Sequence, residues 1–171
     1  MDATAGHRDV GSGSPLRGGP LEVAVGRIQR RSPESLVHRF IDAFNQRDLP
    51  ALEALYAEDA VTLAPSFPEP LKGREAILAV IPGLWAAFPD ARWELRHPVV
   101  TSGNQAAYEV VTQMTHDGPM PMPDGTVLEA TGKQLSYEIG IFLTLDDDGV
   151  IAEERGYLDT AAIATQLGLV G

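Results

Sequence analysis

The sequence contains no cysteine. This absence excludes disulfide bonds, thiolate nucleophiles, and zinc or iron-sulfur sites held by cysteine. There is also no run of about 18 apolar residues of the kind that a membrane-crossing helix needs. The first twenty residues mix Gly, Ser, Pro and Arg without the apolar centre of a secretion signal. We therefore expect a cytoplasmic protein with no membrane partner.

Positively charged residues are few. The sequence has 13 Lys and Arg residues and 24 Asp and Glu residues, which gives a formal net charge of -11. Such a chain repels phosphate backbones, so we expect no nucleic-acid partner. The four histidines, His7, His38, His97 and His116, are scattered and form no close ligand pair. Glycine-rich phosphate loops and nucleophile elbows are absent. We expect neither a metal nor a cofactor.

The length of 171 residues fits one domain with a substantial core. Residues 1–31 are rich in Gly, Ser, Pro and Arg and predict a flexible leader, or an overextended gene start. Residues 32–171 are expected to form the single folded domain. No internal repeat or later shift in composition indicates a second one.

Helices are expected mainly in the first half. Ser32, Pro33 and Glu34 are typical of a helix start, and apolar residues then recur at helical spacing until about Asn45 to Arg47. Asp48 can cap a short second helix. The apolar residues of that second helix are Leu49, Leu52, Leu55 and Tyr56. A third helix is predicted over Arg74–Phe88, with a kink near Leu78–Pro82. A last helix is predicted over Thr160–Leu167, and Gly168 ends it.

Alternating and β-branched segments predict five strands. They cover Ala60–Ala64, Arg92–Thr101, Gln105–His116, Lys133–Leu145 and Val150–Leu158. Asp146–Gly149 is expected to be a hairpin turn, Met120–Thr126 a loop, and Pro98 an edge or a bulge. Helices followed by an antiparallel sheet indicate an α+β fold in which the helices pack against one sheet face.

Several phrases occur together in this order. They are FIDAFNQRDL (40–49), LYAEDAV (55–61), GREAI (73–77), AFPD (87–90), DGVIAEE (148–154), YLD (157–159) and QLG (166–168). With them the chain resembles the SnoaL-like polyketide cyclases of the nuclear transport factor two-like superfamily, over about residues 34–169. The resemblance implies a cone-shaped, curved antiparallel or mixed sheet that the N-terminal helices close around a pocket. It also implies a small apolar ligand and a homodimer.

The strand at 133–145 separates into two sets of side chains that face opposite sides of the sheet. The odd-numbered set is almost purely apolar, whereas the even-numbered set is mixed and includes Glu138 and Phe142. Aligned with the family, the even-numbered set faces the pocket. The apolar set would then face outward and be covered by a partner subunit.

The resemblance implies a histidine and an aspartate as the acid-base pair of ring closure. The matching positions here are Phe142 and Gly156, and neither can move a proton. The cyclase mechanism therefore does not carry over. The mechanism of the ketosteroid-isomerase branch is also not expected, because the positions that match that branch's tyrosine and base are Phe40 and Ala64.

Two glutamates remain as candidates for catalysis. Glu154 lies two residues from Gly156 and so faces the same side of its strand, and we therefore expect it in the pocket close to Glu138. Burial and mutual repulsion would raise the pKa of one of the two carboxyl groups, which would leave a neutral acid beside an ionised base. The alternative is two glutamates at the solvent edge. His116 would act as a base or orient a ligand near the mouth of the cone, or would be a solvated rim histidine.

Large side chains are expected to bind the ligand. Phe40, Phe44, Trp85, Phe142 and Tyr108 would line a pocket for a flat or polycyclic molecule, or would simply fill a core.

The family resemblance, together with these patterns, leaves three functions open. The first is a cyclase or isomerase in which Glu138, Glu154 and His116 move a proton on a polyketide-like carbonyl compound. The second is a non-catalytic ligand-binding or dimerisation domain. The third is hydration of an epoxide, which requires an inward Asp-Arg pair such as Asp159 and Arg155, although Asp159 is also a natural helix cap.

Overall fold

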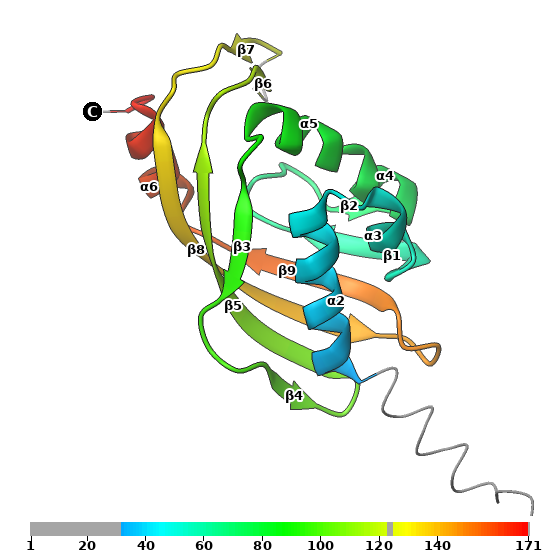
Figure 1. Ribbon diagram of the computed structural model, residues 1–171. Helices are drawn as coiled ribbons and strands as arrows, with labels where there is room; N and C mark the ends of the chain where they lie inside the picture. Colours follow the sequence, from blue (N-terminus) through cyan, green and yellow to red (C-terminus); the bar gives the residue numbers. More distant parts are fainter. Residues whose placement is uncertain (1–31, 123–124, 171) are drawn as a thin grey trace, which may run out of the picture.

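The computed structural model describes residues 32–122 and 125–170. The predicted leader, residues 1–31, lies outside the described residues. Within them the chain forms five helices and a curved mixed sheet of seven strands, with a separate two-stranded pair (Figure 1). This is the α+β architecture that the order of helical and strand patterns predicts.

The first two helices begin where the capping residues predict. The hydroxyl of Ser32 accepts a hydrogen bond from the backbone N–H of Ser35 at the start of α2 (Pro33–Gln46). The carboxylate of Asp48 accepts one from Ala51 at the start of α3 (Leu49–Glu53). The second helix is shorter than expected, because Tyr56 is not helical and instead begins the first strand.

The predicted third helix is divided into α4 (Arg74–Ala79) and α5 (Ile81–Ala87). Pro82 lies in the first turn of α5, where a missing N–H costs no helical hydrogen bond. The predicted kink between Leu78 and Pro82 is therefore confirmed as a break between two short helices.

The sheet has the strand order β2-β1-β9-β8-β5-β3, and β4 also pairs with β5. All of these pairs are antiparallel except β1 with β9, which is parallel. The strands are β1 (Tyr56–Leu63), β2 (Leu71–Lys72), β3 (Arg92–Leu95), β4 (Val100–Ser102), β5 (Gln105–Thr115), β8 (Gln134–Leu145) and β9 (Ile151–Tyr157).

Two strand predictions need correction. The predicted strand Arg92–Thr101 is two strands, β3 and β4, because Pro98 lies between them and cannot donate to a ladder. The segment expected to be a plain loop contains β6 (Met120–Pro121), which pairs with β7 (Val127–Leu128). Each of these pieces is too short for alternation to reveal it.

Helices α2 to α5 lie along one side of the curved sheet, and α6 (Thr160–Leu167) lies beside β8 (Figure 1). Asp159 caps α6 by accepting from the N–H of Ala162, and Gly168 ends it in the left-handed conformation. We call the helix-covered side the inner face. The main core joins α2 to the inner face of β5 and β8.

The odd-numbered set of β8, not the even-numbered set, lies on the inner face. Leu135, Ile141, Leu143 and Leu145 are buried, whereas the side chain of Phe142 is 53 % exposed. The alignment-based expectation is therefore wrong. Burying these four aliphatic side chains in the core removes far more apolar surface from contact with water than burying the mixed set would, and so stabilises the fold more.

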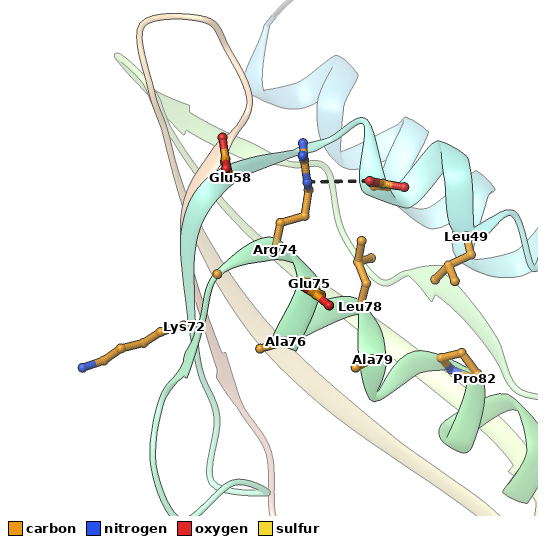
Figure 2. Close-up of a pocket in the computed structure, with 11 residues that line it drawn as sticks. Leu49, Glu58, Lys72, Arg74, Glu75, Ala76, Leu78, Ala79 and Pro82 are labelled. Atoms are coloured by element: carbon orange, nitrogen blue, oxygen red, sulfur yellow. Dashed lines mark ion pairs between the residues drawn. The ribbon is translucent and has the colours of Figure 1, made fainter.

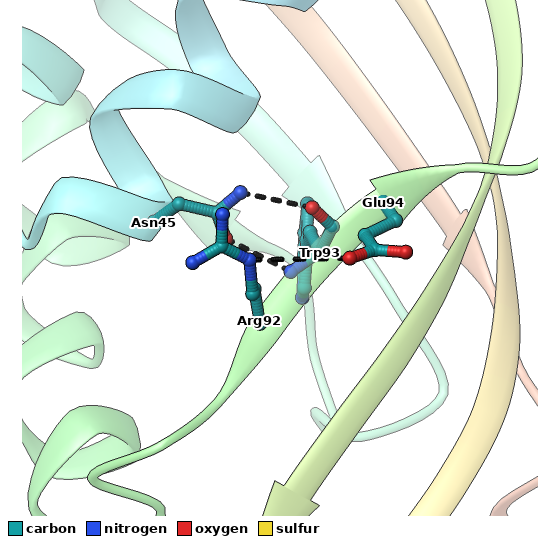
Figure 3. A network of polar contacts seen from close by, with 4 residues as sticks. All are labelled: Asn45, Arg92, Trp93 and Glu94. Atoms are coloured by element: carbon teal, nitrogen blue, oxygen red, sulfur yellow. Dashed lines mark hydrogen bonds and ion pairs between the residues drawn. The ribbon is translucent and has the colours of Figure 1, made fainter.

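Asn45 fixes the end of α2 to the edge strand β3 (Figure 3). Its side-chain amide donates to the carbonyl of Trp93, and its side-chain carbonyl accepts from the N–H of Trp93, both at 2.9 Å. The two bonds place the Trp93 ring against Phe44, with ring centres 4.5 Å apart, and against Phe40, at 5.7 Å. Asn45 thereby sets one aromatic wall of the inner face.

Candidate acid-base site

Glu154 is a carboxylic acid on the inner face of β9. Its register partner on β8 is Leu143, which is buried, and its partner on β1 is Thr62. Residues directly opposite one another in a sheet point to the same face. The hydroxyl of Tyr56, also buried, donates a hydrogen bond to Oε2 of Glu154.

Burial and hydrogen bonding act on Glu154 in opposite directions. Burial raises its pKa, the hydrogen bond from Tyr56 lowers it, and the balance is a pKa above the ordinary value. Burial, with the charge of Glu154 adding to it, raises the pKa of Tyr56 and of Tyr108 well above 10. Both tyrosines therefore keep their hydroxyl hydrogens at neutral pH, and Tyr56 donates its hydrogen to Glu154.

Two further buried hydroxyls accompany this pair. The oxygen atoms of Tyr108 and Thr62 are buried and have no hydrogen-bond partner within the described part of the chain. Buried polar atoms are nearly always paired, so such atoms mark places where a water or a ligand belongs. We call Tyr56, Thr62, Tyr108 and Glu154 the inner polar group.

Aromatic rings stand beside the inner polar group. The ring of Phe40 contacts Tyr56 edge-on, with centres 6.0 Å apart, and Phe44 contacts Trp85 at 5.9 Å. Phe40, Phe44, Trp85 and Tyr108 thus lie on the inner side as expected for ligand contacts, and they pack in the main core. Phe142 does not, because it lies on the outer face against Tyr157.

Glu138 and Glu154 do not meet. An even-numbered residue of β9 lies opposite an odd-numbered residue of β8, as Leu143 with Glu154 shows, so Glu138 has the opposite orientation. Its side chain is 51 % exposed and pairs with Arg96 on the outer face. The expectation that the two carboxylates share the pocket is wrong. Even-numbered residues of β9 pair with odd-numbered residues of β8, so two even-numbered residues on these strands point to opposite faces of the sheet.

His116 is fully buried and is not the solvated rim residue that was one expectation. Its Nδ1 lies 3.1 Å from the hydroxyl of Thr131 and 3.3 Å from the backbone N of Thr131, and its ring packs against Phe88. The structure therefore places His116 just past the end of β5 among α5 and residues 131–133, away from the strand centres that carry Glu154.

The Asp-Arg pair needed for epoxide hydration is not formed by the expected residues. Arg155 faces outward and forms an ion pair with Glu153, at 2.8 Å between Nε and Oε1. The carboxylate of Asp159 is used as the cap of α6.

A surface hollow of about 950 Å³ lies over α3, α4 and the β1–β2 edge (Figure 2). Its lining combines apolar side chains with carboxylates, Lys72 and Arg74. Arg74 is 3.9 Å from Glu53 and also donates to the backbone carbonyl of Tyr56. None of the expected site residues lines it. Its connection to the inner polar group is Arg74, which supports the backbone of Tyr56.

Sequence reasoning missed Tyr56 and Thr62. Tyr56 contacts Glu154, and Thr62 lies opposite it in the sheet, because β1 runs parallel to β9, which is about 90 residues further along the chain. Nothing local in the sequence indicates that pairing. Tyr56 also fitted the apolar face of a helix equally well.

Within residues 32–122 and 125–170, no group of three or more His, Cys, Asp or Glu side chains could hold a metal ion. No helix in the same residues is long and apolar enough to cross a membrane.

Solved structures share this fold. IdmH from Streptomyces antibioticus, a proposed polyketide cyclase, is 26 % identical with a TM-score of 0.66, over 80 % of this chain and 99 % of that one. A proposed SnoaL-like polyketide cyclase from Jannaschia sp. CCS1 is 20 % identical with a TM-score of 0.69, over 82 % and 98 %. An LEH-like epoxide hydrolase from M. tuberculosis is 14 % identical with a TM-score of 0.60, over 80 % and 89 %.

The fold and the inner polar group define a small α+β protein with an acid-base cluster on the helix-covered face of a mixed sheet. A family model for the SnoaL-like domain matches residues 37–154. The chain belongs to the SnoaL-like family, as its sequence phrases predict. No curated protein matches it.

Proposed function

We propose that this chain is a SnoaL-like enzyme of the cyclase or isomerase type that moves a proton on a small, largely apolar carbonyl compound. The observation that supports this most is a partly buried glutamic acid, Glu154, hydrogen-bonded to Tyr56 and accompanied by the unpartnered hydroxyl of Tyr108. A base with a raised pKa beside a free donor is what carbonyl acid-base chemistry requires.

In the proposed reaction, ionised Glu154 removes a proton from the carbon next to the substrate carbonyl. The electron pair of the broken C–H bond forms the enolate, whose oxygen accepts a hydrogen bond from Tyr108. Tyr56 holds Oε2, so Oε1 is left for the substrate. Protonated Glu154 then returns the proton to another carbon in an isomerisation. In a ring closure, the enolate carbon attacks a second carbonyl and Glu154 protonates the resulting alkoxide.

The proposal uses only one of the two expected glutamates. Glu138 lies on the outer face with Arg96, so it cannot reach a substrate on the inner face. His116 is held by Thr131 and Phe88 and has no part in these steps. The missing pair at Phe142 and Gly156 is replaced by a single acid, two residues before Gly156 on the same face of β9.

The test follows deuterium incorporation from D₂O into the α position of 2-tetralone, by proton NMR. Glu154→Gln is expected to lose enzyme-dependent exchange by about 100-fold or more, as removal of a general base does. Glu138→Gln, the same chemical change on the outer face, is the control and should keep the rate. Unchanged exchange in Glu154→Gln would remove Glu154 from the reaction. Wild-type exchange no faster than buffer would favour the non-catalytic binding function.

We also propose that a second copy of the chain covers the outer face. The original reason, an outward apolar set on β8, is wrong because that set is in the core. The support is instead the pair of Phe142 and Tyr157, which are 53 % and 56 % exposed with ring centres 5.8 Å apart. The surrounding charges have both signs, in the pairs Arg96–Glu138 and Arg155–Glu153, so an identical surface is not repelled.

A further inference from the structure

Thr62 is a buried residue on the inner face of β1 whose hydroxyl has no assigned role. The residue is 7 % exposed, and its Oγ1 has no hydrogen-bond partner among the residues that the structure describes. Buried hydroxyls are nearly always paired, because an unpaired one loses its hydrogen bonds to water and gains nothing in return. We therefore expect a polar group beside Thr62 that pairs with its hydroxyl.

Glu154 is in the position to be that group. Thr62 has two register partners in the sheet, Leu71 on β2 and Glu154 on β9, and only Glu154 has a polar side chain. Directly paired residues point to the same face, and neighbouring strands lie roughly 4.8 Å apart. The carboxyl group of Glu154 also leans toward β1, because its Oε2 accepts the hydrogen bond from Tyr56, the first residue of that strand. A hydroxyl and a carboxylate so placed can bond directly or through one water.

The other unpartnered hydroxyl of the inner polar group, that of Tyr108, is further away in the sheet. Tyr108 lies on β5, and β8 separates that strand from β9. The register partner of Tyr108 is Ile141, whose partner on β9 is Gly156 rather than Glu154. Thr62 is therefore the hydroxyl that can hold Glu154 from the adjacent strand, whereas Tyr108 stays with the substrate oxygen in the proposed reaction.

A threonine hydroxyl suits both protonation states of a carboxyl group. It donates to an ionised carboxylate and accepts from a protonated carboxyl group. Each carboxylate oxygen has two lone pairs, so Oε1 of Glu154 can accept from Thr62 with one and take the substrate proton with the other. The hydrogen bond to the ionised form is the stronger of the two, so a partner of this kind favours ionised Glu154.

We infer that Thr62 is a positioning residue that hydrogen-bonds Oε1 of Glu154, directly or through one water. With Tyr56 on Oε2, it holds both oxygens of the carboxyl group from β1 and so fixes the plane of the base relative to a substrate. As a role in catalysis the inference rests on the proposed function, in which Glu154 is the base. The contact itself can be tested without any substrate.

The experiment follows the side-chain carboxyl carbon of Glu154 by ¹³C NMR between pH 4 and 9, in protein that contains ¹³C-labelled glutamate. The Glu154→Gln variant identifies the signal. Thr62→Val removes the hydroxyl and keeps the β-branched shape that strands favour, so the variant retains the fold. The titration midpoint of Glu154 should then lie roughly half a pH unit or more above the wild-type midpoint, because a hydrogen bond to the ionised form is lost.

Two further variants separate this contact from a general effect on the core. Thr62→Ser restores the hydroxyl and should keep the wild-type midpoint. Thr112→Val makes the same chemical change at another buried, unpartnered hydroxyl, on β5 opposite Trp93 and Tyr137, and should also keep it. The inference is overturned if Thr62→Val leaves the midpoint in place or lowers it. It is also overturned if Thr62→Ser or Thr112→Val raises the midpoint as much as Thr62→Val does.

The titration and the exchange of 2-tetralone distinguish this inference from the proposed function. A higher midpoint in Thr62→Val supports the contact even where wild-type exchange is no faster than buffer, a result that counts against the proposed function alone. An unchanged midpoint removes the contact and leaves the Glu154-dependent exchange untouched. Where exchange occurs, its inflection in Thr62→Val should move to higher pH together with the carboxyl titration.

Discussion

At the scale of single residues, the site depends on a carboxylic acid that is held inside by one hydrogen bond. Gly156, where the family resemblance implies an acid, faces the same side as Glu154, and a Cβ atom there would lie 3.6 Å from the Cβ of Ala64. In the proposed mechanism the acid therefore lies two residues earlier along β9, on the same face of the strand.

The pH dependence of exchange follows from the two effects on Glu154. In the proposed reaction ionised Glu154 is the base, so we expect the rate to fall as the pH drops through its raised pKa. Tyr56→Phe removes the hydrogen bond that lowers this pKa, so the inflection of the rate profile should move to higher pH. The measurement is the initial deuteration rate of 2-tetralone between pH 4 and 9, with the Glu154→Gln rate subtracted. An inflection that stays in place or moves to lower pH would contradict this role of Tyr56.

The inward direction of Glu154 could be predicted from its parity with Gly156, because a strand's period of two is a property of the local sequence. The partner of Glu154 could not. Tyr56 reaches it only through the parallel pairing of β1 with β9, and that contact is set by the whole sheet. For the same reason the sequence could not show that His116 is enclosed by Phe88 and Thr131.

At the scale of the elements, the contact between α2 and β3 fixes the position of the aromatic side chains beside the site. Asn45 makes two hydrogen bonds to the backbone of Trp93 and so holds the ring against Phe40 and Phe44. Because β3 is the outermost strand of its sheet, these bonds also satisfy backbone groups at its free edge. The aromatic wall therefore depends on a polar contact.

Asn45→Ala should lower the free energy of unfolding by about 1 to 3 kcal/mol, since two hydrogen bonds to partly buried backbone groups are lost. Urea denaturation followed by the fluorescence of Trp85 and Trp93, the two tryptophans in the sequence, measures the change. Glu94→Ala is the matched control in Figure 3, because the Arg92–Glu94 pair is exposed and 4.0 Å apart. Its effect should stay within about 0.5 kcal/mol. Equal stability of the Asn45→Ala and wild-type proteins would contradict the clamp.

Capping signals predicted the helices well, because Ser32, Asp48 and Asp159 act through neighbours three residues away. The face of β8 was mispredicted for a different reason. Alternation divides a strand into two sets but does not say which set is inside, and the alignment with the family favoured the mixed set. The apolar set is inside because α2 offers it an apolar partner.

At the scale of the whole molecule, the outer face presents its aromatic pair to the surroundings. Phe142→Ser combined with Tyr157→Ser should convert the proposed dimer to a monomer, because the apolar area that a second copy would cover is removed. Sedimentation velocity at several protein concentrations measures the association state. The pair His38→Ser and Asp42→Ser, exposed polar residues of α2 away from the outer face, is the control and should leave it unchanged. A wild-type protein that stays monomeric at high concentration would contradict the proposed dimer.

The α+β fold class was predictable from the order of the segments, since helical spacing precedes alternation along the chain. The family was predictable from phrases that build the scaffold. Those phrases do not show that the residues of the inner polar group lie together, because these residues come from β1, β5 and β9 and meet only in the folded molecule. Function in this fold therefore has to be argued from the residues of the inner face.

The most direct test of the central claim compares two substitutions that are chemically identical and differ only in the face of the sheet that carries them. It is the ratio of the 2-tetralone deuteration rate of Glu138→Gln to that of Glu154→Gln at neutral pH. If Glu154 is the inner-face base and Glu138 an outer-face ion-pair residue, the ratio should be about 100 or more. A ratio near 1 would contradict the assignment of the acid-base role to Glu154.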